Sequence, residues 1–227
     1  MMLNPVYIEA RDLGDAWFQS IDAVVNKGRC WTVQQGSYEG QKRYELDFVT
    51  VRISHPETRP LVPDMPQHMG DVPPPTTIEY IENDYLPYLM TAEVKKGETY
   101  TYGSRLADQI EVVIERLRQS PGTNQCSMSI AQPSDINLVD PPCLRELDCR
   151  LFSSEGLQEG EKPALHFITY WRSWDAYNGF PANLAGLQYL KEYMATEIGV
   201  ASGETIAASK GLHVYGHALP LALQRVR

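Results

Sequence analysis

Apolar residues recur every three or four positions in several parts of the chain. The clearest repeats lie in residues 10–27, 104–119 and 183–198. This spacing gathers apolar side chains on one face of a helix, so each segment is predicted to be helical. Residues 77–92 carry a similar but weaker pattern, and Pro87 is expected to interrupt that helix.

Alternating apolar and polar residues mark a second set of segments. They are residues 44–53, 125–131, 140–152, 164–171 and 212–219. Alternation with β-branched and aromatic residues predicts strands, whose side chains point to opposite faces in turn. A polar turn rich in glycine and glutamate is expected to join the third and fourth of these strands.

Prolines break any regular pattern between residues 55 and 76, so we expect a long loop there. Helices otherwise mix with strands joined by hairpins, and no internal repeat is visible. The order of elements predicts an α/β (α+β) fold, with residues 1–227 forming a single domain.

Composition narrows the function without naming it. The chain has 227 residues, of which 43% are hydrophobic and 22% charged, and its net charge is −9. An acidic chain offers no broad basic surface for nucleic acid or anionic lipid, so neither partner is expected. No apolar run is long enough for a transmembrane helix, and the N-terminus does not read as a signal peptide, which predicts a cytoplasmic protein.

The four cysteines lack the spacing of zinc ligands, so no metal site is predicted, and in the cytosol they are expected to be free thiols. Cys143 is the notable one, because two prolines precede it at the start of a predicted strand. Arg172 follows 29 positions later, a spacing that suits two adjacent antiparallel strands. A nearby cation stabilises a thiolate, so Cys143 is a candidate nucleophile. The alternative is that Cys143 is a small buried apolar residue.

The stretch "YWRSWDAYNGFPANLAGLQYL" gathers Arg172, Ser173, Asp175 and Asn183 before and within a predicted helix. Arginine and serine can hold a phosphate, and an asparagine amide can pair with a base edge that has both a donor and an acceptor. The alternative is a helix cap at Asn183 and a structural ion pair at Arg172. Further on, His213 and Tyr215 share one face of a strand and could hold a sugar hydroxyl, or could simply lie half-exposed.

In order, "DPPC", "YWRSWDAYNGFPANLAGLQYL" and "GLHVY" resemble the thymidylate synthase family. The family pattern is Pro-Cys, then Arg-Ser-x-Asp, Gly-x-Pro-x-Asn, a helix and His-x-Tyr. The upstream "YTYGSRL" also resembles a family segment, and the match extends from about residue 100 to 217. The chain looks most like the short branch found in archaea and some bacteria. The resemblance implies a large mixed β-sheet flanked by helices and a homodimer formed through the sheet face.

The resemblance implies a role for each matching residue. Cys143 is the nucleophile that adds to pyrimidine C6, while Arg172 and Ser173 hold the nucleotide phosphate and Arg172 also supports the thiolate. Asp175 makes a contact near the base, and Tyr102 assists proton removal from C5.

Three further residues would select the nucleotide. Asn183 reads the O4 and N3 edge, where an aspartate would favour cytosine, and this implies a uridine substrate. His213 and Tyr215 bind the sugar 3′-hydroxyl. The resemblance assigns no cofactor-binding residue.

The implied reaction is C5 methylation of a uridine nucleotide, dUMP to dTMP. The one-carbon donor would be 5,10-methylene-tetrahydrofolate or a modified pterin such as methylene-tetrahydromethanopterin. Two alternatives stay open: a pyrimidine nucleotide 5-hydroxymethylase that uses the same addition chemistry, and a nucleotide-binding homologue without turnover.

The chain departs from the family pattern around the phosphate. Residues 123–125 read "TNQ" where the partner subunit normally supplies arginines, and "QQGSY" at 34–38 replaces an arginine-bearing loop, although Lys42 and Arg43 lie close by. Leu144 replaces a common histidine, and the tail that closes over the folate is expected to be missing. These departures permit the hydroxymethylase alternative. The family's catalytic glutamate is not located, with Glu79 and Glu82 as candidates.

Overall fold

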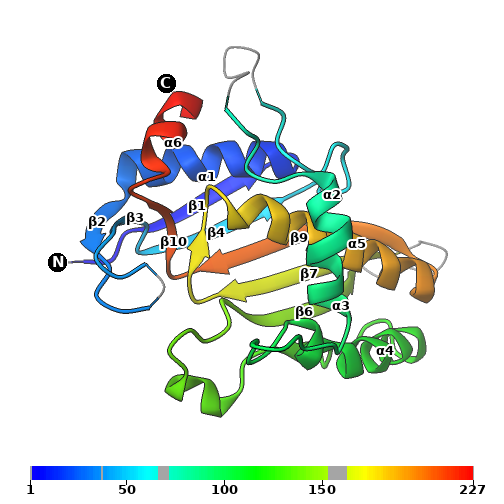
Figure 1. The fold of residues 1–227 in the computed structure, drawn as a ribbon. Helices are drawn as coiled ribbons and strands as arrows, with labels where there is room; N and C mark the ends of the chain where they lie inside the picture. Colours follow the sequence, from blue (N-terminus) through cyan, green and yellow to red (C-terminus); the bar gives the residue numbers. More distant parts are fainter. Residues whose placement is uncertain (1, 37, 66–71, 153–162, 227) are drawn as a thin grey trace.

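Two β-sheets, one of six strands and one of four, form the framework of the computed structural model (Figure 1). The structure describes residues 2–36, 38–65, 72–152 and 163–226. The strands are β1 (Pro5–Ala10), β2 (Arg29–Thr32), β3 (Lys42–Glu45), β4 (Phe48–Ile53), β5 (Ser127–Ser129), β6 (Leu144–Phe152), β7 (Ala164–Trp171), β8 (Trp174–Asp175), β9 (Ala201–Ser209) and β10 (Leu212–Tyr215). The helices are α1 (Leu13–Lys27), α2 (Ile78–Tyr80), α3 (Leu86–Met90), α4 (Gly103–Gln119), α5 (Gly179–Ile198) and α6 (Leu219–Val226), with a π-helical turn η2 (Ile81–Tyr85) and a 3-10 turn η3 (Pro133–Asn137).

The larger sheet is mixed, with strand order β1-β4-β9-β7-β6-β5. Strand β1 runs parallel to β4 and β7 runs parallel to β9, whereas β4 and β9, β6 and β7, and β5 and β6 are antiparallel. Helix α1 packs against β1, and α5 packs against β9 and β7. This large mixed sheet flanked by helices confirms the predicted fold class.

Strand β7 shows how the sheet divides its two faces. Its residues Leu165, Phe167 and Trp171 are buried in the core, while Ile168 and Tyr170 on the other face are exposed. Period-two alternation of this kind is what a sheet with one covered face requires.

The segment predicted as one strand at 44–53 is two strands in different sheets. The chain breaks at Leu46, whose backbone N–H donates to the Leu212 carbonyl at 2.9 Å, and at Asp47, whose carboxylate accepts from Arg29 at 2.7 Å. The break lets β3 pair with β10 while β4 pairs with β1 and β9. The smaller sheet, ordered β2-β3-β10-β8, carries much of the site described below.

Strand β9 was not predicted, although it lies between β4 and β7. Its sequence, "ASGETIAAS", is small and polar, so it lacks the apolar alternation that marks a strand. Small residues are needed here: a Cβ on Gly203 would approach Cε1 of His166 to 2.8 Å. Strands β1 and β2 and helix α6 were also missed.

The predicted helices at 10–27 and 104–119 are confirmed, with small shifts at their ends. The segment 77–92 forms α2, η2 and α3 in direct succession. Pro87 therefore does not end the helix; it lies just after the change from π-helical to α-helical winding. The polar turn expected between β6 and β7 falls mainly outside the described residues. Within the described residues, no helix is both long and apolar enough to cross a membrane.

Candidate active site

Cys143 and Arg172 are neighbours at the same end of two antiparallel strands. Cys143 directly precedes β6 and Arg172 directly follows β7, and the Arg172 backbone N–H donates to the Cys143 carbonyl at 2.9 Å. The predicted pairing of these two residues across adjacent strands is confirmed. All four cysteines are free; Cys126 and Cys149 are buried, and Cys143 is half-buried.

The Arg172 guanidinium holds the turn that carries the cysteine. Its Nε donates to the Pro141 carbonyl at 3.1 Å and the Pro142 carbonyl at 3.2 Å, and its Nη2 contacts Asp140 Oδ1 at 3.0 Å. No hydrogen bond from Nη1 to any described residue is present. Arg172 therefore orients the Cys143 backbone and keeps donors for a ligand.

A cavity of about 580 Å³ brings most of the predicted site residues together. Its walls are formed by the smaller sheet, by Pro141 and by the loop after η3. The predicted residues that line it are Cys143, Arg172, Ser173, Asp175, His213 and Tyr215.

Arg43 also lines this cavity, although its sequence context marked it only as a nearby cation. It lies opposite Tyr215 across the β3–β10 pair, and Glu45 lies opposite His213. Nη2 of Arg43 contacts Glu45 Oε2 at 2.9 Å, while its buried Nε has no partner. The strand register, which the sequence alone does not reveal, is what brings this second arginine into the cavity.

The loop that replaces the expected arginine-bearing segment still reaches the cavity. Gln35, Gly36 and Tyr38 line it, and the Tyr38 ring stacks on Tyr215 with the centroids 4.1 Å apart. Gly36 adopts φ 94°, a left-handed conformation that glycine accepts without strain. The loop supplies an amide and a ring instead of a charge.

His213 lines this cavity as a neutral ring with one hydrogen-bond acceptor. Its Nδ1 is 2.8 Å from the Gly211 carbonyl, which can only accept, so Nδ1 carries the proton. The buried Nε2 then holds a lone pair and has no partner. Burial lowers the pKa of His213 to about 4, which keeps the ring neutral at physiological pH. Such an acceptor suits a ligand hydroxyl.

Asp175 shapes the start of α5. Its Oδ1 accepts from the backbone N–H groups of Tyr177 at 2.9 Å and Asn178 at 3.2 Å, which stabilises the turn into the helix. Asn183 is the fifth residue of α5, and Asn178 is the residue at its N-cap. The alternative that Asn183 caps the helix is therefore wrong.

Asn183 lines a second cavity, of about 460 Å³, that adjoins the first at Asp175. Its amide donates to the Tyr85 hydroxyl and accepts from the Trp174 indole. Asn183 therefore does not line the Cys143 cavity itself, but Asp175 lines both.

Tyr102 is buried at the N-terminus of α4, and its hydroxyl oxygen accepts from the Leu144 backbone N–H at 3.3 Å. Burial raises the pKa of Tyr102 well above its ordinary value of 10.0. The phenol therefore keeps its proton, but Tyr102 does not line the cavity that contains Cys143.

Burial also raises the pKa of the Cys143 thiol above its ordinary value of 9.0, and the Arg172 charge opposes that effect. The free site consequently holds a thiol at neutral pH. Formation of a nucleophilic thiolate requires loss of this proton when a ligand binds.

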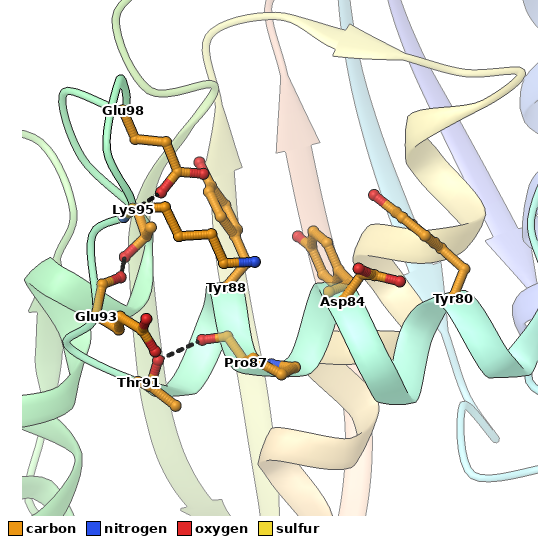
Figure 2. Close-up of a pocket in the computed structure, with 10 residues that line it drawn as sticks. Tyr80, Asp84, Pro87, Tyr88, Thr91, Glu93, Lys95 and Glu98 are labelled. Carbon is orange, nitrogen blue, oxygen red and sulfur yellow. Dashed lines mark hydrogen bonds between the residues drawn. The ribbon is translucent and has the colours of Figure 1, made fainter.

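A third cavity, of about 340 Å³, adjoins the second at Tyr80 and Tyr85 (Figure 2). Figure 2 shows Tyr80, Asp84 and Tyr88 along the helical segment, facing Glu98 and the extended Lys95 side chain. The Lys95 backbone N–H donates to Glu98 Oε2 at 2.8 Å, which ties the loop together. Tyrosine rings and carboxylates therefore line a cavity next to the one that contains Asn183.

Comparison with known proteins shows the family of the chain. The family model described as thymidylate synthase matches residues 81–227. The chain belongs to the thymidylate synthase family. A Methanosarcina mazei protein named "Putative thymidylate synthase" is 32% identical over 217 residues, covering 92% of this chain and 89% of its own length. Similarly named proteins from Methanococcoides burtonii and Methanopyrus kandleri are 30% and 26% identical, covering 92% and 96% of this chain and 89% and 96% of their own lengths.

Thymidylate synthase family membership implies a pyrimidine nucleotide substrate and a folate or pterin one-carbon donor.

Neither glutamate considered for catalysis lines any of the three cavities described above. Glu79 and Glu82 are both exposed, and Glu82 accepts a hydrogen bond from Tyr189 at 3.0 Å.

Proposed function

We propose that the chain converts dUMP to dTMP through addition of the Cys143 thiolate to C6 of the uracil ring. The observation that carries the proposal is the shared cavity of Cys143, Arg172, Ser173, His213 and Tyr215. One wall offers a nucleophile and a cation, and the other offers a neutral acceptor suited to a sugar hydroxyl. A protein that only binds nucleotides does not need the thiol.

As the Sγ–C6 bond forms, the C5–C6 double bond opens, and its electron pair moves onto C5 and the C4 carbonyl oxygen. Donors directed at O4 stabilise this developing charge, and the remaining N–H of the Asn183 amide is assigned that role. C5 is then able to attack a one-carbon electrophile. Loss of the C5 proton would release the one-carbon unit from its donor and leave a methylene group on C5. Addition of a hydride from the donor, or of water in the hydroxymethylase alternative, would complete the product as the Sγ–C6 bond breaks.

Tyr102 is assigned to the departure of the C5 proton. Because its pKa is raised by burial, it does not act as a phenolate. It acts as a positioned hydroxyl that orients the water or group that takes the proton.

The phosphate is assigned to Arg43, Arg172 and Ser173. Both arginines line the cavity, and hydrogen bonds between charged partners contribute about 1.5–3 kcal/mol each. Two arginines are fewer than the family usually gathers, so Arg43 compensates for part of the missing charge.

The residues beyond Cys143 fit a folate or pterin donor in their chemistry. Tyr80 and Tyr85 offer aromatic surface, and Asp84, Glu93 and Glu98 offer acceptors for ring amino groups. When bound, the donor supplies the one-carbon unit and, for methylation, the reducing hydride.

We also propose that the protein forms a homodimer through the uncovered face of the larger sheet. Tyr7, Phe152, Ile168 and Tyr170 are exposed there at 61%, 43%, 38% and 36%. Light scattering after size exclusion should give twice the chain mass, and Ile168→Glu should shift the protein toward monomer. A monomeric wild-type protein would refute this assignment.

Release of tritium from [5-³H]dUMP tests the chemistry. Wild-type protein with a reduced pterin should release tritium, Cys143→Ala should release none, and Cys30→Ala should behave as wild type because Cys30 lies outside the cavity. Tritium release that persists in Cys143→Ala would overturn the mechanism. Mass spectrometry of the product separates the two enzymatic alternatives, since C5 gains either a methyl or a hydroxymethyl group.

A further inference from the structure

The Asn183 amide is held between two aromatic side chains. Its Oδ1 accepts a hydrogen bond from the Trp174 indole Nε1–H at 3.0 Å. Its Nδ2 donates to the Tyr85 hydroxyl oxygen at 2.8 Å. Both contacts are made before any ligand is present.

The two contacts differ in what they enforce. An indole N–H can only donate, so it must face the amide oxygen. A tyrosine hydroxyl can donate or accept, so Tyr85 would tolerate the amide turned either way. Trp174 alone therefore determines that the amide oxygen faces the indole and the amide nitrogen faces Tyr85.

Trp174 is itself held in place. It is 2% exposed, and its ring stacks on Trp171 with the centroids 4.6 Å apart. The tilted Phe180 ring also packs against it, with the centroids 4.3 Å apart. The Trp174 backbone N–H donates to the Gly211 carbonyl at 2.9 Å. The indole donor is thus fixed by packing on both sides.

An amide has two N–H donors and two acceptor lone pairs, so these contacts leave one of each. Uracil presents an N3–H beside the O4 carbonyl, whereas cytosine presents an N3 acceptor beside an amino group. A freely rotating asparagine amide matches either base by turning over. An asparagine alone consequently does not distinguish uracil from cytosine.

We propose that Trp174 is the residue that makes the protein select uracil over cytosine, because its indole fixes the orientation of the Asn183 amide. This inference rests on the proposed function, in which Asn183 reads the O4 and N3 edge. The indole holds the amide oxygen on the Trp174 side and leaves the amide nitrogen on the Tyr85 side. In the proposed function this fixed orientation presents the amide donor to O4 and the amide acceptor to N3–H, which is the pairing uracil requires.

Calorimetry with dUMP and dCMP on three proteins tests the inference. Trp174→Phe keeps an aromatic ring in the stack but removes the donor. Trp17→Phe is the matched control, since it removes an equally buried indole, whose N–H donates to the Tyr177 carbonyl at 3.2 Å. The preference for dUMP should fall about fivefold to 100-fold in Trp174→Phe and stay near the wild-type value in Trp17→Phe.

The ratio of the two affinities is the decisive readout, because both nucleotides share every contact except the base edge. A wild-type protein that prefers dUMP, together with a Trp174→Phe variant that keeps the same preference, refutes this inference alone. A wild-type protein that binds neither nucleotide refutes the proposed function.

Hydrogen exchange of the indole N–H groups in wild-type protein gives a second test that needs no variant. The Trp174 signal should be protected from exchange like that of Trp171, while the half-exposed Trp31 should exchange fast. An unprotected Trp174 indole would overturn the inference even if Trp174→Phe does not fold.

Discussion

Removal of the sugar 3′-hydroxyl is expected to weaken nucleotide binding through one atom, Nε2 of His213. In the free protein that acceptor is buried and has no partner, and the Gly211 carbonyl fixes the proton on the other ring nitrogen. A ligand hydroxyl satisfies Nε2, whereas a 3′-deoxy sugar covers it without a donor. An unsatisfied buried acceptor costs about 1–3 kcal/mol, which corresponds to about fivefold to 150-fold in affinity.

Calorimetry with dUMP and 2′,3′-dideoxyuridine monophosphate measures this difference directly. His213→Phe removes the acceptor while keeping a ring, so the two ligands should bind that variant with affinities within about threefold of each other. The small remaining difference would come from Tyr215. His217→Phe is the control, because His217 does not line the cavity. Equal affinity for both ligands in wild-type protein, or undiminished discrimination in His213→Phe, would refute the role given to Nε2.

Three further predictions concern charge. Arg43→Gln should weaken binding of dUMP about tenfold but leave deoxyuridine unchanged, since the lost contact is to the phosphate; calorimetry with both ligands decides, and an equal loss would contradict the assignment. The kcat/KM for dTMP formation should rise with pH above neutrality, because burial raises the Cys143 pKa, and Arg172→Gln should move that rise to higher pH; a profile that is flat from pH 7 to 9 argues against it. Asp135 is paired with Arg105 at 2.7 Å, and mainly that hydrogen bond lowers the pKa of Asp135 to about 2. Asp135→Asn should therefore lower the free energy of unfolding, measured with urea at pH 7, by about 2 kcal/mol. The difference between wild type and variant should disappear as the pH falls from 4 to 2, because the carboxylate is then protonated.

Local patterns in the sequence were sufficient to predict that Cys143 and Arg172 lie close together, but they left open whether Cys143 is a nucleophile or a small buried residue. Cys143, Arg172 and Ser173 stand at the ends of two strands with strong alternation, so their approach follows from simple antiparallel pairing. His213 and Tyr215 also follow from alternation, with Val214 buried between them. These residues were predictable because each lies on an element whose pattern is unambiguous.

Other features depend on tertiary structure that no local pattern encodes. Arg43 reaches the cavity only because β3 leaves the line of β4 and pairs with β10. Strand β9 is hidden by its small and polar residues, and the close approach of His166 requires one of them, Gly203. The contact between Trp174 and Asn183 depends on stacked rings and a helix start that lies four residues earlier than predicted.

The pairing of β6 with β7 fixes the positions of Cys143 and Arg172 independently of the number of residues that join the two strands. Its pairing runs from Leu144 and Trp171 at the site to Phe152 and Ala164 at the far end, about 26 Å away at strand spacing. The pairing of the two strands therefore keeps Cys143 and Arg172 in register whatever the number of residues that follow Phe152. The gap between Cys143 and Arg172 should be treated as variable when distant relatives are sought by motif.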